Sequence, residues 1–169
     1  MLPSPDKPPR TPHAGTEREV LTAQLDDKRT ILLRKVAGLP DDDLRRPSTV
    51  SSLSLLGLLK HAAYVERWWF RWVFAGEDVA FPWTDDDPDA DFRPEPDETA
   101  EDLAALYVAE IERSRTIVAG AQLGDPASRP SPREEATLRG IMVHMIQETS
   151  RHLGHADIMR EAIDGETGD

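Results

Sequence analysis

The side chains of this sequence best suited to chemistry are one histidine and a glutamate–histidine pair, far apart along the chain. Glu148 and His152 are four residues apart, so in a helix they share one face and lie about 6 Å apart along its axis. His61 lies in an earlier segment rich in leucine and alanine. Imidazole and carboxylate groups that meet inside a protein are typical ligands of divalent metal ions. If the two segments are neighbouring helices, all three side chains can reach one ion.

The same residues also have simpler interpretations. A single histidine in a leucine-rich helix is usually a hydrogen-bonded core residue, and a glutamate–histidine pair at this spacing is usually solvated. Spacing alone therefore leaves open both a metal site and a metal-free bundle with buried polar residues. His144 lies two turns before His152, about 12 Å by helix rise, so we leave it out of the metal set. His155 either orients a ligand or lies on the helix surface, and His13 is predicted to be uninvolved.

Four segments with helical periodicity must position these residues. The predicted helices cover residues 16–37, 52–75, 99–121 and 131–163. Thr16 with Glu19, and Thr99 with Asp102, have the spacing of capping boxes, and Pro132 stands at the expected first position of the last helix. No segment alternates apolar and polar residues as a half-buried strand does. We therefore predict an all-α fold, a four-helix bundle in which the long connection 78–97 crosses one end.

The length and the ends of the chain predict its organisation. A chain of 169 residues fits one domain, and residues 1–15 are typical of a disordered, proline-rich lead-in, so the bundle is expected over residues 16–165. Neither a secretory signal nor an apolar run of membrane-spanning length is recognised, which predicts a cytoplasmic protein. Trp68, Trp69 and Trp72 cannot all point the same way. At least one ring is expected at the surface, lining a pocket or a contact in a homodimer.

Charge and cysteine content restrict the partners. The formal net charge of −12 repels phosphates, so we predict no binding to nucleic acid or to an anionic membrane surface. The chain has no cysteine, which excludes disulfides, thiolate metal ligands and a cysteine nucleophile. Any sulfur chemistry therefore needs a thiol from outside the protein, and the expected partner is a small-molecule substrate.

Two segments carry a family resemblance. The sequence ETSRHLGHADIMREAIDG, residues 148–165, resembles the C-terminal signature of the DinB/YfiT-like superfamily. The sequence LLGLLKHAAYVERWWF, residues 55–70, resembles the second helix of the same superfamily. The likeness extends over nearly the whole chain after the lead-in, and it is stronger to an actinobacterial branch. The chain is also similar to the N-terminal metal-binding domain of mycothiol-dependent maleylpyruvate isomerases, which carry glutamate at the position of Glu148.

The resemblance implies a fold, a metal and a reaction type. The fold is a four-helix bundle with an up-down-down-up connection, and the metal is a divalent ion held by side chains matching His61, Glu148 and His152. Two imidazoles and a carboxylate leave a tetrahedral zinc ion one open position, as in catalytic sites, with nickel, manganese and iron as alternatives. The implied activity is thiol S-transfer or thiol-assisted isomerisation with mycothiol or another small thiol. Metal-assisted hydrolysis and non-catalytic metal or small-molecule binding stay open as alternatives.

Overall fold

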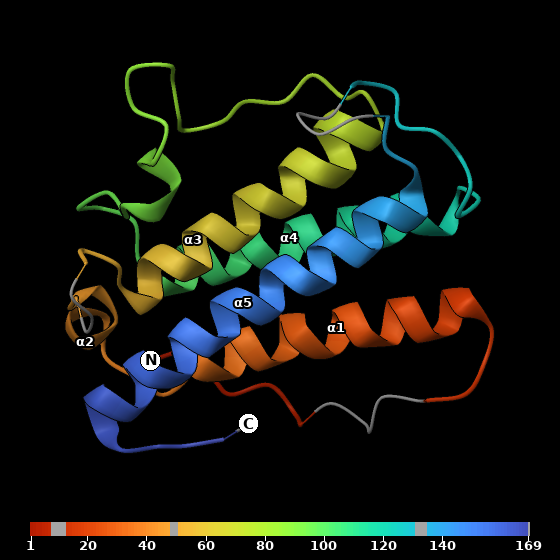
Figure 1. Ribbon diagram of the computed structural model, residues 1–169. Helices are drawn as coiled ribbons and strands as arrows, with labels where there is room; N and C mark the ends of the chain where they lie inside the picture. Colours follow the sequence, from red (N-terminus) through yellow and green to blue (C-terminus); the bar gives the residue numbers. More distant parts are fainter. Residues whose placement is uncertain (8–12, 48–50, 131–134, 169) are drawn as a thin grey trace.

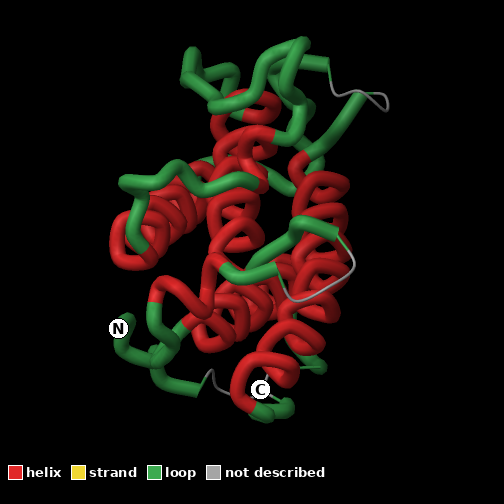
Figure 2. The backbone as a smooth tube through the Cα atoms, turned by 90° about the vertical axis from the view of Figure 1, so that its left-hand side faces the viewer, coloured by secondary structure: helices red, strands yellow, loops and turns green. Residues whose placement is uncertain are grey.

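The computed structural model describes residues 1–7, 13–47, 51–130 and 135–168, and within these ranges the protein is helical without a β-strand (Figures 1 and 2). The α-helices are α1 (Glu17–Val36), α2 (Asp41–Arg45), α3 (Leu55–Glu66), α4 (Ala100–Ala119) and α5 (Leu138–Asp164). A π-helix, η1 (Arg67–Phe74), continues α3, and a short 3₁₀-helix, η2 (Ala90–Phe92), precedes α4. The prediction of an all-α fold is confirmed.

The helices begin where polar side chains satisfy the first backbone N–H groups. Both predicted capping boxes are present, Thr16 with Glu19 at α1 and Thr99 with Asp102 at α4. α3 begins at Leu55, because the Ser54 hydroxyl accepts a hydrogen bond from the Gly57 N–H at 3.1 Å. These caps set the residue at which each helix begins.

Two element boundaries differ from the sequence prediction. The last helix begins at Leu138 with Thr137 as its N-cap, so a start near residue 131 is wrong; residues 131–134, with Pro132, lie outside the described part of the chain. On either side of these residues, the Ala127 N–H donates to the carbonyl of Ala136 at 2.7 Å. The segment after Pro40, which lies outside the four predicted helices, contains α2.

The four long helices pack in pairs. α3 makes its most extensive contacts with α4, and α1 with α5, while smaller contacts join α3 to α5 and to α1. One apolar core cluster lies around Leu32, Leu58 and Tyr107, and a second lies around Phe70 and Met142. The contact between α3 and α5 is the one that brings His61 toward the glutamate–histidine pair.

The long connection between η1 and α4 runs back along α3 and does not cross an end of the helices (Figure 1). The Arg67 guanidinium donates to the carbonyl of Ala80 at 2.9 Å, and the ring of Trp83 lies 6.1 Å from that of Tyr64. The Lys60 ammonium donates to the Arg93 carbonyl at 3.0 Å. The connection therefore follows α3 from its C-terminal end to its N-terminal half, and our prediction for its course is wrong.

A glycine allows the connection to approach α3 closely. A Cβ atom placed on Gly57 would lie 2.2 Å from the carbonyl oxygen of Phe92, a distance that side-chain carbons do not tolerate. Gly57 lies one turn before His61 on the same face of α3. The absence of a side chain at Gly57 thus lets η2 rest against the helix beside His61.

The core also contains a buried ion pair. The Arg29 guanidinium donates two hydrogen bonds of 2.7 Å to Glu66, and the hydroxyl of Ser114 donates to the same carboxylate at 2.8 Å. Both charged side chains are almost completely buried. Burial alone would lower the pKa of Arg29, but the neighbouring Glu66 and Asp26 carboxylates raise it, so the guanidinium stays charged. Together with Ser114, this ion pair joins α1 and α4 to the junction of α3 and η1.

The first residues of the chain contact the helices. The Gly38 N–H donates to the Leu2 carbonyl at 3.0 Å, and the Arg34 side chain donates to the Pro5 carbonyl at 2.9 Å. The division of the chain at residue 15 stays a prediction. Among the described residues, no helix has the length and apolar character needed to cross a membrane.

Candidate metal centre

Three side chains from α3 and α5 meet at one point. His61, Glu148 and His152 each offer one ligand atom, and these atoms all lie within 4.8 Å of one another. Oε1 of Glu148 is 3.0 Å from Nε2 of His152 and 4.0 Å from Nε2 of His61. The rings of His61 and His152 meet edge to face, with 4.7 Å between their centroids. These are the three residues that the sequence predicts.

The connection beside α3 holds the ring of His61. Nδ1 of His61 is 2.7 Å from Oδ2 of Asp91, a residue that is only 4 % exposed. The ring of Phe92 stacks on the imidazole at 3.8 Å between centroids and an angle of 16°. A carboxylate at one imidazole nitrogen fixes the tautomer and directs the other nitrogen toward a ligand. Asp91 and Phe92 are therefore part of the centre, although neither is predicted from the sequence.

Burial and charge act in opposite directions on Glu148. Burial alone would raise its pKa, but the charge and hydrogen bond of His152, with smaller effects of Arg151 and His144, hold the pKa below the usual 4.5. Burial and the neighbouring His61 lower the pKa of His152 below its usual 6.5, and they outweigh the effect of Glu148. Near neutral pH the pair thus consists of a carboxylate and a neutral imidazole, the protonation states that bind a metal.

The donor set fits a divalent ion. Nε2 of His61 is buried and has no hydrogen-bond partner among the described residues, although it faces Glu148 across 4.0 Å. A buried polar atom without a partner is costly, and an ion bound between these groups would remove that cost. Two imidazole nitrogens and one carboxylate oxygen are the ligands of many catalytic zinc sites. The arrangement can therefore hold one ion with a coordination position left for another molecule.

The remaining histidines lie outside this group. His144 is one turn before Glu148 on α5, and its ring lies 4.5 Å from that of Trp69. His155 is exposed, with its ring 6.1 Å from that of His152, and His13 is exposed in the segment before α1. The exclusion of His144 from the predicted ligand set agrees with this geometry.

An aromatic cavity of about 350 Å³ opens at His61. Trp68 from η1, Trp83 from the connection and Phe92 are among its lining residues. Trp68, Trp69 and Trp72 are all partly exposed, and Trp68 is the one of these three that lines this cavity. The candidate metal centre is therefore next to a space that a small molecule can enter.

The comparisons with known proteins agree with the sequence resemblance. Residues 20–165 match the family model described as mycothiol-S-transferase. A crystal structure of a conserved protein from Enterococcus faecalis has a similar fold, with a TM-score of 0.64 and 16% sequence identity over 90% of this chain and all of that chain. No curated protein matches the sequence. Because the family model spans nearly the whole sequence, the chain belongs to the mycothiol-S-transferase family, a DinB-like family.

Proposed function

We propose that this protein is a metal-dependent S-transferase that joins a low-molecular-weight thiol, such as mycothiol, to a small electrophilic substrate. The observation that carries the proposal is the convergence of His61, Glu148 and His152 within 4.8 Å in a chain of the mycothiol-S-transferase family. Because the chain contains no cysteine, the thiol must be a separate molecule. The match to this family favours thiol transfer over the two alternatives, metal-assisted hydrolysis and non-catalytic binding of a metal or small molecule.

The ligand set favours zinc, with nickel, manganese or iron as alternatives. Imidazole and carboxylate ligands without thiolate suit zinc or nickel better than copper(I), and they are too rich in nitrogen for calcium. A divalent ion held by these residues would offer an open position, and a thiol bound there would have a lowered pKa. His61 and His152 would hold the ion through imidazole nitrogens, and the carboxylate of Glu148 would offset part of its charge.

The protein's own side chains contribute to the reaction by holding and orienting the metal ligands and the two reactants. Asp91 fixes the tautomer of His61, and Phe92 keeps its ring in position. In the overall transfer, the thiol proton goes to solvent and the sulfur forms a bond to an electrophilic carbon of the substrate. The leaving group departs with the electron pair of the bond that breaks. Positioning the two reactants side by side would accelerate this step.

The test uses the full chain, purified without a histidine tag or chelator. The metal content is measured first, and mycothiol is then supplied with 1-chloro-2,4-dinitrobenzene while thioether formation is followed by absorbance. We expect turnover that is lost on chelation and restored by zinc, with an unchanged far-ultraviolet spectrum. Turnover that survives complete removal of metal, or no turnover of metal-loaded protein with mycothiol or other small thiols, would contradict the proposal.

We also propose that α1, α3, α4 and α5 form a four-helix bundle with an up-down-down-up connection. The proposal is supported by the pairing of α3 with α4 and of α1 with α5, and by their directions in Figure 1. α1 and α5 run one way, and α3 and α4 run the other. A domain over residues 16–165, a cytoplasmic location, a homodimer and the absence of nucleic-acid binding remain predictions. Light scattering on the purified chain would test the homodimer.

A further inference from the structure

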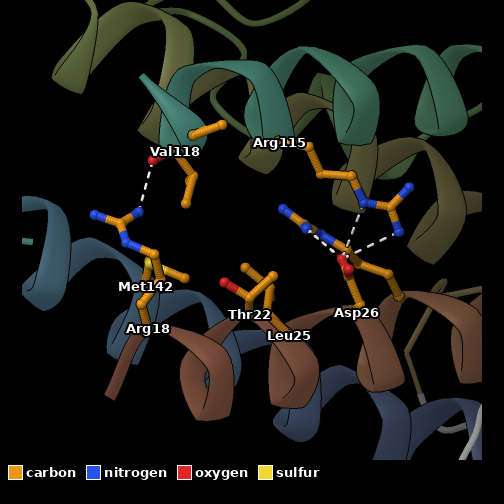
Figure 3. Close-up of a pocket in the computed structure, with 9 residues that line it drawn as sticks. Arg18, Thr22, Leu25, Asp26, Arg115, Val118 and Met142 are labelled. Carbon is orange, nitrogen blue, oxygen red and sulfur yellow. Dashed lines mark hydrogen bonds and ion pairs between the residues drawn. The ribbon is translucent and has the colours of Figure 1, made fainter. Parts of the chain in front are cut away.

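A cavity of about 320 Å³ lies at the seam between α1 and α4, away from the candidate metal centre (Figure 3). It lies between Leu25 of α1, Val118 of α4 and Met142 of α5, and we call it the seam cavity. It shares no lining residue with the aromatic cavity at His61. α1 and α4 are not among the helix pairs that pack extensively, which leaves room for this cavity between them.

Two arginine side chains bridge the seam at the ends of this cavity. The guanidinium of Arg18 on α1 donates to the carbonyls of Val118 at 2.7 Å and Ala121 at 2.6 Å. Arg115 on α4 reaches in the other direction and pairs with Asp26 on α1 at 3.2 Å. Figure 3 shows Arg18 at one end of the cavity and Arg115 at the other. Because both bridges connect the two helices, the space between them can take a small molecule but not a peptide laid along the seam.

The charges around the seam cavity are offset by other groups of the protein. Asp26 accepts hydrogen bonds from both Arg29 and Arg115. Arg29 is also paired with the buried Glu66. The guanidinium of Arg18 faces carbonyls at the C-terminal end of α4, where the negative end of the helix dipole offsets part of its charge. A charged molecule that enters would therefore lose its water without gaining an unpaired counter-charge, so the cavity favours an uncharged ligand.

Between the two bridges, the walls of the cavity are almost entirely apolar. Leu25, Val118 and Met142 are all buried, and they come from three different helices. Thr22 adds one hydroxyl on the α1 side, and Figure 3 shows no hydrogen bond from it to the other residues drawn. Well-packed proteins have few voids larger than a water molecule, so ordinary packing does not account for a space of this size. Its volume and lining are those of a small-molecule site.

We propose that the seam cavity is a second small-molecule site, separate from the metal centre, and that it binds an uncharged aromatic molecule with one hydrogen-bonding group directed at Thr22. An aromatic ring is favoured because the thioether of Met142 and the guanidinium of Arg18 both make favourable contacts with ring faces or edges. None of the three candidate metal ligands lines this cavity, so binding requires neither the metal nor a thiol. The proposal therefore does not depend on the proposed function.

The test follows the ¹³C-labelled methionine methyl groups of the full chain by NMR at pH 7 while indole is added. Met142 lines the seam cavity, and Met159, which lies in the other core cluster, is the internal reference. We expect a saturable shift of the Met142 signal, which is identified by its loss in Met142→Leu, and little change at Met159. Indole-3-acetate and tryptamine carry the same ring with a negative and a positive charge, and each should bind at least about tenfold more weakly than indole. Removal of metal with a chelator should leave the dissociation constant for indole unchanged.

Substitutions in and outside the cavity complete the test. Val118→Phe fills the cavity with a ring and should weaken indole binding at least about tenfold, while Val143→Phe, at an exposed position of α5, should bind like the parent. Thr22→Val keeps the shape of the side chain, removes the hydroxyl and should weaken binding by about three- to tenfold. An unchanged Met159 signal shows that each variant is folded. The inference is overturned if indole does not shift the Met142 signal, if either charged analogue binds as tightly as indole, or if Val118→Phe or Thr22→Val binds like the parent.

Discussion

Nδ1 of His61 lies 2.7 Å from Oδ2 of Asp91, and this contact leaves Nε2 of His61 to face Glu148 and His152. Asp91 is buried by the packing of η2 on α3 and lies on the far side of the imidazole from Glu148. A carboxylate in this position fixes the tautomer of the ring and restricts its rotation. The connection between η1 and α4 thus completes a centre whose ligands come from α3 and α5.

Replacing Asp91→Asn should weaken metal binding by about 10- to 100-fold. The uncharged amide that replaces the carboxylate no longer fixes the tautomer of His61. The dissociation constant for zinc is measured by competition with a chromophoric chelator. Asp86→Asn, an exposed residue of the same acidic connection, is the matched control and should bind zinc like the parent. Equal affinities for the Asp91→Asn variant and the parent would show that Asp91 does not position the ligand.

Gly57→Ala should destabilise the protein by about 1–3 kcal/mol and weaken zinc binding, because the new methyl group collides with the Phe92 carbonyl. Displacement of η2 would carry Asp91 away from His61. Gly154→Ala in α5 is the control: its Cβ has no atom within 4 Å, so it should gain up to about 1 kcal/mol of helix stability. Denaturant unfolding compares the two. A Gly57→Ala variant as stable as the parent would mean that η2 moves freely.

Some residues of the candidate metal centre can be predicted from the sequence, and others cannot. Glu148 and His152 are predictable as neighbours because residues four apart share one helical face, whereas the inclusion of His61 with them is implied by the family resemblance and left open by spacing. Asp91 resembles the other aspartates of its connection, and nothing in the sequence tells which one reaches His61. Gly57 is the one available signal, since a glycine inside an apolar helix often marks the close approach of another backbone. The predicted start of the last helix near residue 131 is wrong because Thr137, which caps the helix at Leu138, is an equally good N-cap residue.

The metal-free protein should lose stability as the pH falls from 7 to 5. The folded state lowers the pKa of His152 below 6.5, so the unfolded chain takes up this proton at a higher pH. The contribution of His152 to stability is therefore complete above about pH 6.5 and declines as the pH falls through that value toward the lower, folded pKa. Urea unfolding at several pH values should show a shallower decline for His152→Gln than for the parent. Identical slopes would contradict the assigned shift.

Glu66→Gln should cost about 3–5 kcal/mol of unfolding free energy, because it leaves the buried Arg29 guanidinium without its main counter-charge. The control is Glu112→Gln, which removes an exposed ion pair with Arg115 and should cost less than about 1 kcal/mol. Both values come from urea unfolding at pH 7. A small effect of Glu66→Gln would mean that Asp26 or water compensates for the loss.

The number of zinc ions bound per chain tests the central claim most directly. The full-length parent, His61→Ala, His152→Ala and His144→Ala are each loaded with zinc, freed of excess metal and analysed for zinc and protein. His144 lies one turn before Glu148 on α5, so its replacement controls for loss of any histidine near the centre. The account predicts one zinc per chain for the parent and for His144→Ala, and none for His61→Ala and His152→Ala. Full zinc occupancy in His61→Ala and His152→Ala would contradict it.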